Sequence, residues 1–120
     1  MPLETYPDLD VWGTAMDWVV AAYGLPLRFP DQERYGLRSQ IQRAAVSIPA
    51  NVAEGYGRLH RGDYVHHLSV SRGSLAELET HILLSVRLRN VPEVDALPVW
   101  GQRQGVGRML HKLIQSLTRK

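Results

Sequence analysis

The sequence predicts an all-α protein, an antiparallel up-down four-helix bundle, on two observations. Apolar residues recur at intervals of three and four in four segments, and short links containing glycine or proline separate these segments. The 120 residues are enough for one hydrophobic core and too few for two. We therefore expect a single domain over residues 1–120, in which residues 1–9 form an N-terminal tail.

The first helix is expected to follow this tail, with Asp8 or Asp10 as its N-cap, and to end at Gly24 before Pro26. Its apolar residues have the spacing of an amphipathic helix that faces a core. Trp18 lies off the predicted buried face, so packing does not explain its position, and an aromatic ring there is available to stack on a base. The predicted buried face consists of Trp12, Ala15, Met16, Val19, Val20 and Tyr23.

The second helix is expected from a cap at Asp31 to about Gly57, and it contains a proline. Pro49 has no backbone N–H and its ring crowds the carbonyl of Ala45, so we expect a kink at Pro49. The side chains around the proline are unusually small, which predicts that another helix packs close to this backbone. The predicted buried face consists of Leu37, Ile41, Ala44, Ala45, Ile48, Val52 and Tyr56.

Two segments carry a family resemblance: FPDQERYGLRSQIQRAAVSIPANVAEGYGR, at residues 29–58, and SRGSLAELE, at residues 71–79. Together they closely resemble the four-helix-bundle family encoded in intervening sequences of bacterial 23S ribosomal RNA genes. A related branch of that family is the accessory protein of diversity-generating retroelements. The resemblance implies a small, all-helical homo-oligomer, often a pentamer, with a nucleic-acid role and no established enzymatic activity. It also implies, as one option, a reverse transcriptase as partner.

A third helix is expected from a cap at Asp63 to about Leu88. Arg72 and Glu79 project near the centre of its apolar stripe, where two unpaired charges would cost several kcal/mol each. We therefore expect a polar lock between the second and third helices, in which Glu79 pairs with a partner such as Arg38, and Arg72 with a partner such as Glu54. A catalytic site at Arg72 and Glu79 is the alternative. The predicted apolar stripe consists of Tyr64, Val65, Leu68, Leu75, Ala76, Leu78, Ile82, Leu83 and Val86.

Glycines and a proline complicate the rest of the chain. Gly73 lies in the middle of the third helix, where glycine costs about 1 kcal/mol relative to alanine, so we expect a close helix contact there, within or between subunits. Pro98 predicts that the fourth helix begins near that residue. The buried face of the fourth helix is predicted to consist of Val106, Met109, Leu110, Leu113, Ile114 and Leu117.

Composition excludes several classes of protein. The chain has no cysteine, no apolar run near the roughly 20 residues that cross a bilayer, and no secretory signal, so we expect a soluble cytoplasmic protein. No phosphate-binding loop, nucleophile elbow or dinucleotide fingerprint is present, which predicts a non-enzymatic protein without a cofactor. The i, i+4 pairs Asp63 with His67 and Glu77 with His81 offer two ligands each, fewer than the three or four of a zinc site, so no metal is expected.

The cations suggest a function instead. No Asp or Glu occurs from Ala96 to Lys120, and the fourth helix places Arg108, Lys112 and Arg119 opposite its apolar stripe. With Arg58 and Arg61 of the link after the second helix, they are the predicted nucleic-acid-binding residues, suited to sequence-independent, salt-sensitive binding of RNA or DNA. An ordinary solvated surface is the alternative interpretation, in which case the protein is a protein–protein interaction module that binds no nucleic acid.

Overall fold

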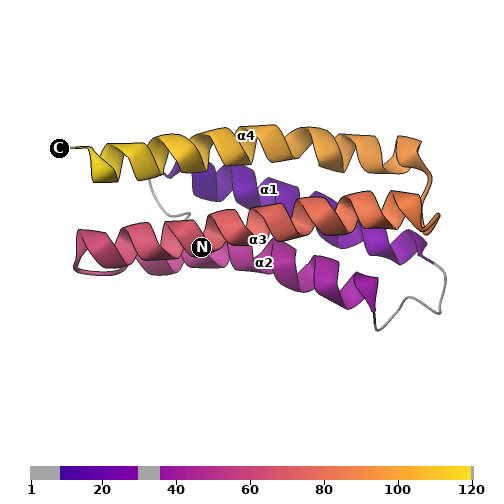
Figure 1. Cartoon of the computed structure of the whole chain (residues 1–120), viewed down its shortest axis with the longest axis horizontal. Helices are drawn as coiled ribbons and strands as arrows, with labels where there is room; N and C mark the ends of the chain where they lie inside the picture. Colours follow the sequence, from indigo (N-terminus) through magenta and orange to yellow (C-terminus); the bar gives the residue numbers. More distant parts are fainter. Residues whose placement is uncertain (1–8, 30–35, 120) are drawn as a thin grey trace, which may run out of the picture.

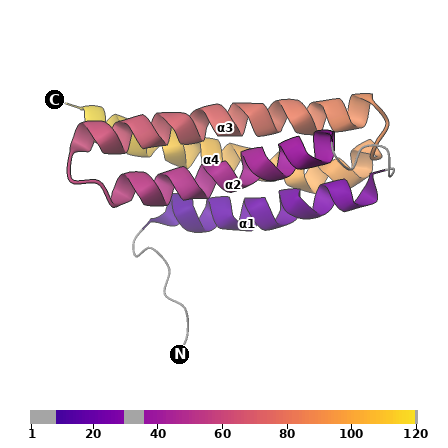
Figure 2. The ribbon, with the colours of Figure 1, turned by 90° about the horizontal axis from the view of Figure 1, so that it is seen from below.

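The computed structural model describes residues 9–29 and 36–119, and these residues form a bundle of four α-helices, as the sequence predicts. The helices are α1 (Asp10–Gly24), α2 (Leu37–Tyr56), α3 (Arg61–Arg87) and α4 (Glu93–Thr118), and a 3-10 turn, η1 (Leu25–Arg28), follows α1. Figures 1 and 2 show that the chain reverses direction between successive helices. Each helix contacts the next in sequence, and α1 also contacts α4.

The buried face of α1 is not the predicted one. Trp18 is 0% exposed, and its indole Nε1–H donates a hydrogen bond to the Val99 carbonyl oxygen at 2.8 Å. Val20, predicted to be buried, is 73% exposed. Apolar residues occur around most of this helix, so their spacing allows two different buried faces. The face with Trp18 is the buried one, because burial of this indole removes a large apolar area from water and its N–H finds a hydrogen-bond partner. The buried residues of α1 are Val11, Ala15, Trp18 and Ala22.

Helix α2 follows the prediction more closely. Its predicted face is buried from Ile41 to Val52, while Tyr56 at the end of that face is 45% exposed. The helix continues across the buried Pro49 without a break, and the bend at this residue stays a prediction. The predicted close approach of another helix is confirmed at Gly55, where an added Cβ would lie 2.8 Å from the His67 Cβ of α3.

Helix α3 is rotated relative to the prediction, because the face that meets α2 includes small polar residues. Ser71 and Ser74 are buried, whereas Ala76 and Leu83, both assigned to the apolar stripe, are exposed. An added Cβ at Gly73 would meet no atom within 4 Å, so the expected contact within the subunit is wrong.

Helix boundaries also differ from the predictions. The N-caps of α1 and α3 are Leu9 and His60, so Asp10 and Asp63 fall in the first turns, where a carboxylate still favours the positive end of the helix dipole. The other candidate cap of the first helix, Asp8, and the expected cap of the second, Asp31, lie outside the described residues, as does most of the tail.

Helix α4 begins at Glu93, five residues before the predicted Pro98. A proline at this position removes the N–H that would bond the Val94 carbonyl, but Val94 is 69% exposed, so this part of the helix faces solvent, where an unbonded carbonyl costs less than in the core. Within the described ranges, no helix has the length and apolar character needed to cross a membrane.

Candidate nucleic-acid interface

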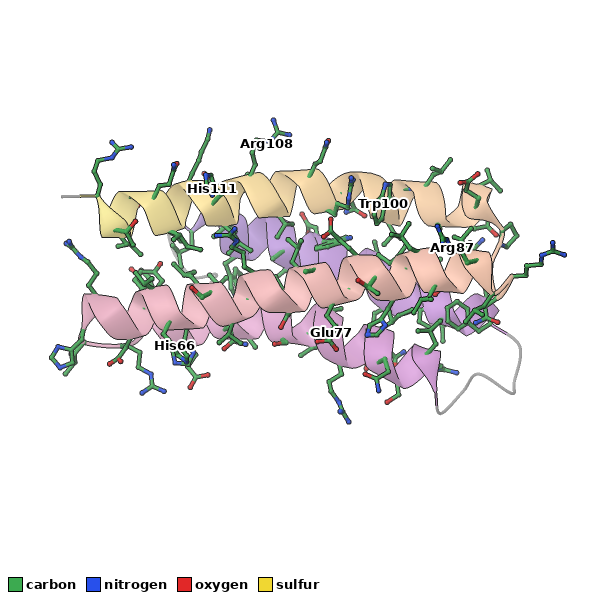
Figure 3. The ribbon with its side chains drawn as sticks, in the orientation of Figure 1. His66, Glu77, Arg87, Trp100, Arg108 and His111 are labelled. Atoms are coloured by element: carbon green, nitrogen blue, oxygen red, sulfur yellow. The ribbon has the colours of Figure 1, made fainter. Side chains whose placement is uncertain are left out.

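The basic face, which we define as Arg108, Lys112 and Arg119, lies on the outer surface of α4 and just beyond its C-terminal end. Val106 and Leu110, on the opposite side of the helix, are buried in the core, and this burial orients Arg108 and Lys112 outward. Arg119 was predicted to lie on the same helix, but α4 ends at Thr118 and Arg119 has an extended backbone. All three cations are exposed, and Figure 3 shows Arg108 pointing away from the other helices.

The cations of the basic face form no ion pair with a carboxylate of the described residues. Arg103, one turn before them, differs: its Nε lies 3.0 Å from Glu79 Oε2, and its guanidinium lies 3.8 Å from the centre of the Trp100 ring. Arg103 therefore serves packing between α3 and α4. The positive charge of the basic face remains available to an external anion.

The link between α2 and α3 holds the other predicted cations. Arg58 and Arg61 are both exposed, but Arg58 Nη2 lies 2.8 Å from Glu54 Oε1, so its charge is partly neutralised. Figures 1 and 2 place this link at the same end of the bundle as the C-terminus of α4. The fold thus brings the predicted nucleic-acid-binding residues to one end and one edge of the molecule.

The predicted polar lock is wrong in its pairing. Arg72 is exposed, Glu79 pairs with Arg103 of α4, and Glu54 pairs with Arg58 one turn away on its own chain segment. Arg38 forms no ion pair with a described carboxylate. The reason is the rotation of α3, which turns Arg72 to solvent and turns Glu79 toward α4. Arg72 and Glu79 consequently form no joint charged site.

A neutral network replaces the lock between α2 and α3. The hydroxyls of Ser47 and Ser74 lie 2.8 Å apart, and Ser71 donates to the Ile48 carbonyl at 2.8 Å. The Asn51 amide donates to the Ser47 carbonyl, which leaves its Oδ1 to accept from His67 Nδ1 at 3.1 Å. The serine spacing in the third helix matched that of the buried leucines, and this was the signal that the sequence analysis missed.

The remaining titratable groups form no chemical centre among the described residues. No three His, Asp or Glu side chains there are grouped as metal ligands would be. His81 Nε2 lies 3.5 Å from Glu77 Oε1, and its Nδ1 is buried with no hydrogen-bond partner in the described part of the chain. His67, the other predicted pair member, contacts Asn51 rather than Asp63.

Two apolar grooves lie on opposite sides of the bundle. The α1–α2 groove, of about 570 Å³, is lined by Val20, Tyr23, Leu27 and Val46 among others. The α3–α4 groove, of about 230 Å³, is lined by residues that include Leu83, Val86, Leu97 and Trp100. Because α1 and α2 form one side of the bundle and α3 and α4 the other, one molecule presents both grooves at once.

Comparisons with known proteins agree with this fold. The chain is similar to a crystal structure of a protein with unknown function from the S23 ribosomal protein family from Bacteroides thetaiotaomicron, with a TM-score of 0.80 and 20% identity. That match covers 88% of this chain and 98% of the other. No curated protein matches the chain. A sequence model of the 23S rRNA-intervening sequence proteins matches residues 7–112, most of the chain, which therefore belongs to the 23S rRNA-intervening sequence protein family.

Proposed function

We propose that this chain is a non-enzymatic, homo-oligomeric bundle protein of the cytoplasm that associates with RNA or DNA as an accessory or scaffold. The observation that carries the proposal is the basic face, three exposed cations in a stretch, residues 96–120, that contains no Asp or Glu. Guanidinium and ammonium groups neutralise phosphates and release their counterions, which requires no reading of bases. Binding is therefore independent of sequence.

Self-association is the second part of the proposal, and the two apolar grooves support it. A contact between the α1–α2 groove of one copy and the α3–α4 groove of the next joins different surfaces, and such contacts close into rings when the rotation allows. The family resemblance suggests a pentamer. A ring repeats the basic face in every subunit, so weak phosphate contacts add up to strong binding.

The family resemblance also supplies a candidate protein partner. In the accessory branch, the scaffold would present nucleic acid to a reverse transcriptase. In such a complex the basic face, which is exposed in this chain, would hold the nucleic acid.

The test is nucleic-acid binding at increasing salt, by fluorescence anisotropy with generic RNA and DNA. Three phosphate contacts predict that affinity falls about 40-fold between about 50 and 200 mM salt. The triple variant Arg108→Glu, Lys112→Glu, Arg119→Glu is expected to weaken binding by at least about 30-fold at low salt.

The matched control changes the net charge equally but elsewhere. Arg43 and Arg72 are exposed arginines of α2 and α3, and Arg89 is an exposed arginine of the link after α3. Their change to glutamate is expected to weaken binding much less. Absence of binding at low salt, or equal losses of affinity in both triple variants, contradicts the role of the basic face.

Measurement of the mass in solution checks self-association, and a strict monomer contradicts the ring.

A protein–protein interaction module is the second candidate, and the exposed apolar grooves favour it. In that case a partner protein rather than a second copy covers a groove. The variants Val20→Lys and Leu97→Lys separate the two candidates, because each introduces a charge into one groove. If the protein is an oligomer and either variant lowers its mass, the grooves join copies of this chain. If the mass is unchanged while nucleic-acid binding is absent, the interaction module is favoured.

A further inference from the structure

The link between α2 and α3 presents an apolar side chain to solvent. Leu59 is 96% exposed, the highest value among the large apolar residues that the structure describes. It lies between Arg58 on one side and His60 and Arg61 on the other, and all three are exposed. A single exposed leucine is common in proteins, so its meaning depends on how the link is held and on what surrounds it.

The two helices are closely packed at the base of the link. An added Cβ at Gly55 would also lie 3.0 Å from the Tyr64 ring, so α2 and α3 already touch just below the link. The rings of Tyr56 and Tyr64 meet edge to face with their centres 6.1 Å apart. The Arg58 N–H donates to the Gly55 carbonyl at 3.1 Å, and the Tyr64 N–H donates to the His60 carbonyl at 3.2 Å. Leu59 therefore projects from a link whose two ends are closely packed and hydrogen-bonded.

Arg61 is the cation near Leu59 whose charge is left to an anionic partner. Glu54 and Asp63 flank the stretch from Gly55 to Gly62 and Glu54 pairs with Arg58, but the stretch itself has no carboxylate and Arg61 forms no ion pair with a described carboxylate. The C-terminal end of α4, with Arg119 of the basic face, lies at the same end of the bundle. An apolar side chain among cations suits a ligand whose surface is charged and whose interior is apolar, which describes stacked base pairs inside a phosphate backbone.

The dimensions and the side chains favour duplex DNA over single strands. Two packed helices are about 20 Å across, wider than a major groove of about 12 Å, so only the link can enter a groove. Leucine is one of the side chains that minor-groove proteins insert between base steps. The rings near the link, Tyr56 and Tyr64, pack edge to face on each other, and residues 101–120 contain no Phe, Tyr or Trp on which unpaired bases could stack.

We propose that Leu59 is a wedge that enters the minor groove of duplex DNA and inserts between adjacent base pairs, while Arg61 and the basic face hold the phosphates. This inference rests on the proposed nucleic-acid association and adds the class of nucleic acid and the contacting side chain. A wedge must unstack a base step, and a mismatched step is easier to unstack. The protein is therefore expected to bind a mismatched duplex about 10-fold more tightly than a paired one.

The experiment uses the full-length protein and three DNA probes of about 20 nucleotides: a paired duplex, the same duplex with one central mismatch, and its single strand. Anisotropy measures affinity, and a 2-aminopurine base beside the mismatch reports unstacking as a rise in fluorescence. The variant Leu59→Ser is expected to lose the preference for the mismatch and the fluorescence rise, and to retain salt-dependent binding to the paired duplex. Leu88→Ser is the matched control, because Leu88 is 59% exposed in the link at the other end of the bundle, between Arg87 and Arg89. Leu88→Ser is expected to keep the mismatch preference and the fluorescence rise of the parent protein.

The outcomes separate the wedge from the proposed function. Salt-dependent binding without preference for the mismatch, or a preference that survives Leu59→Ser, overturns the wedge and leaves phosphate binding intact. Tighter binding to the single strand also overturns it. A lower mass of Leu59→Ser in solution assigns the side chain to a contact between subunits and overturns it too. Absence of binding to every probe at low salt overturns both proposals.

Discussion

Two helix contacts of this bundle are built in different ways. Between α2 and α3 the backbones approach closely at Gly55, and small polar groups such as Ser71 and Ser74 join the helices by hydrogen bonds. Between α1 and α4 a large side chain, Trp18, is fully buried and donates a hydrogen bond to the carbonyl of Val99. The first contact is made by small groups at close approach, whereas the second contains a bulky aromatic side chain.

The difference has consequences for stability and for recognition. Close approach and fixed hydrogen bonds set the register of α2 against α3, and thereby the position of the link that carries Leu59. The aromatic contact instead fixes the rotation of α1 and decides which apolar side chains, such as Val20, remain at the surface. Thus the α2–α3 contact supports the proposed DNA wedge, and the α1–α4 contact leaves the α1–α2 groove open.

The largest expected effect comes from Trp18→Ala. It removes a fully buried indole and its hydrogen bond, so we expect the free energy of unfolding to fall by about 3–5 kcal/mol, as for other buried aromatics. Val20→Ala, two residues away but exposed, is expected to change it by less than about 0.5 kcal/mol. Urea unfolding measured at constant protein concentration gives both values. Equal losses for the two variants would indicate that both stripes of α1 are buried in solution, for instance between subunits.

The next effect compares two glycines. At Gly55 an alanine Cβ would lie 2.8 Å from the His67 Cβ, so Gly55→Ala is expected to destabilise by about 1–3 kcal/mol even though alanine favours helices. At Gly73 the same change meets open space and is expected to stabilise by about 0.5–1 kcal/mol. Thermal and urea unfolding measure both.

The two glycine variants also test whether α3 takes part in a contact between subunits. If Gly73→Ala destabilises the protein and lowers its mass in solution, Gly73 lies at a contact between subunits, as one of the two sequence-based options proposed. If Gly55→Ala stabilises the protein, the close approach of α2 and α3 is not maintained in solution.

The sequence predicted α2 well because its large apolar residues, such as Ile41 and Ile48, occupy one side only. It failed for α1 because apolar residues surround that helix, and periodicity alone does not tell which side an indole will choose. It misplaced the start of α4 because a proline in the second turn costs little when the carbonyl it leaves unbonded is exposed, as at Val94.

The candidate site was predictable in the same uneven way. The exposure of Arg108 and Lys112 followed from their spacing opposite an apolar stripe on the same helix, whereas Arg119, predicted on that helix, lies just after its end. The ion-pair partner of Glu79 could not be predicted from spacing, because it depends on how α3 is rotated relative to α4. The exposure of Leu59 could not be predicted from periodicity, because Leu59 lies in a link whose position depends on how closely α2 and α3 pack.

The smallest expected effect is a dependence on alkaline pH at the α2–α3 contact. Burial, and secondarily the nearby Tyr56, raise the pKa of Tyr64 above its ordinary value of 10.0. The folded protein therefore keeps the Tyr64 proton at a pH where the unfolded chain has lost it. Below pH 10 both states are protonated and this group leaves stability unchanged with pH, but as the pH rises above 10 the unfolded state ionises first and stability falls.

Urea unfolding between about pH 9 and about pH 11 should thus show a steeper loss of stability for the parent protein than for Tyr64→Phe, with Tyr23→Phe as the control for removal of one exposed phenol. Because Tyr64 is only partly buried, water screens the effect, and its absence would mean that the helices open at the base of the link and hydrate the ring.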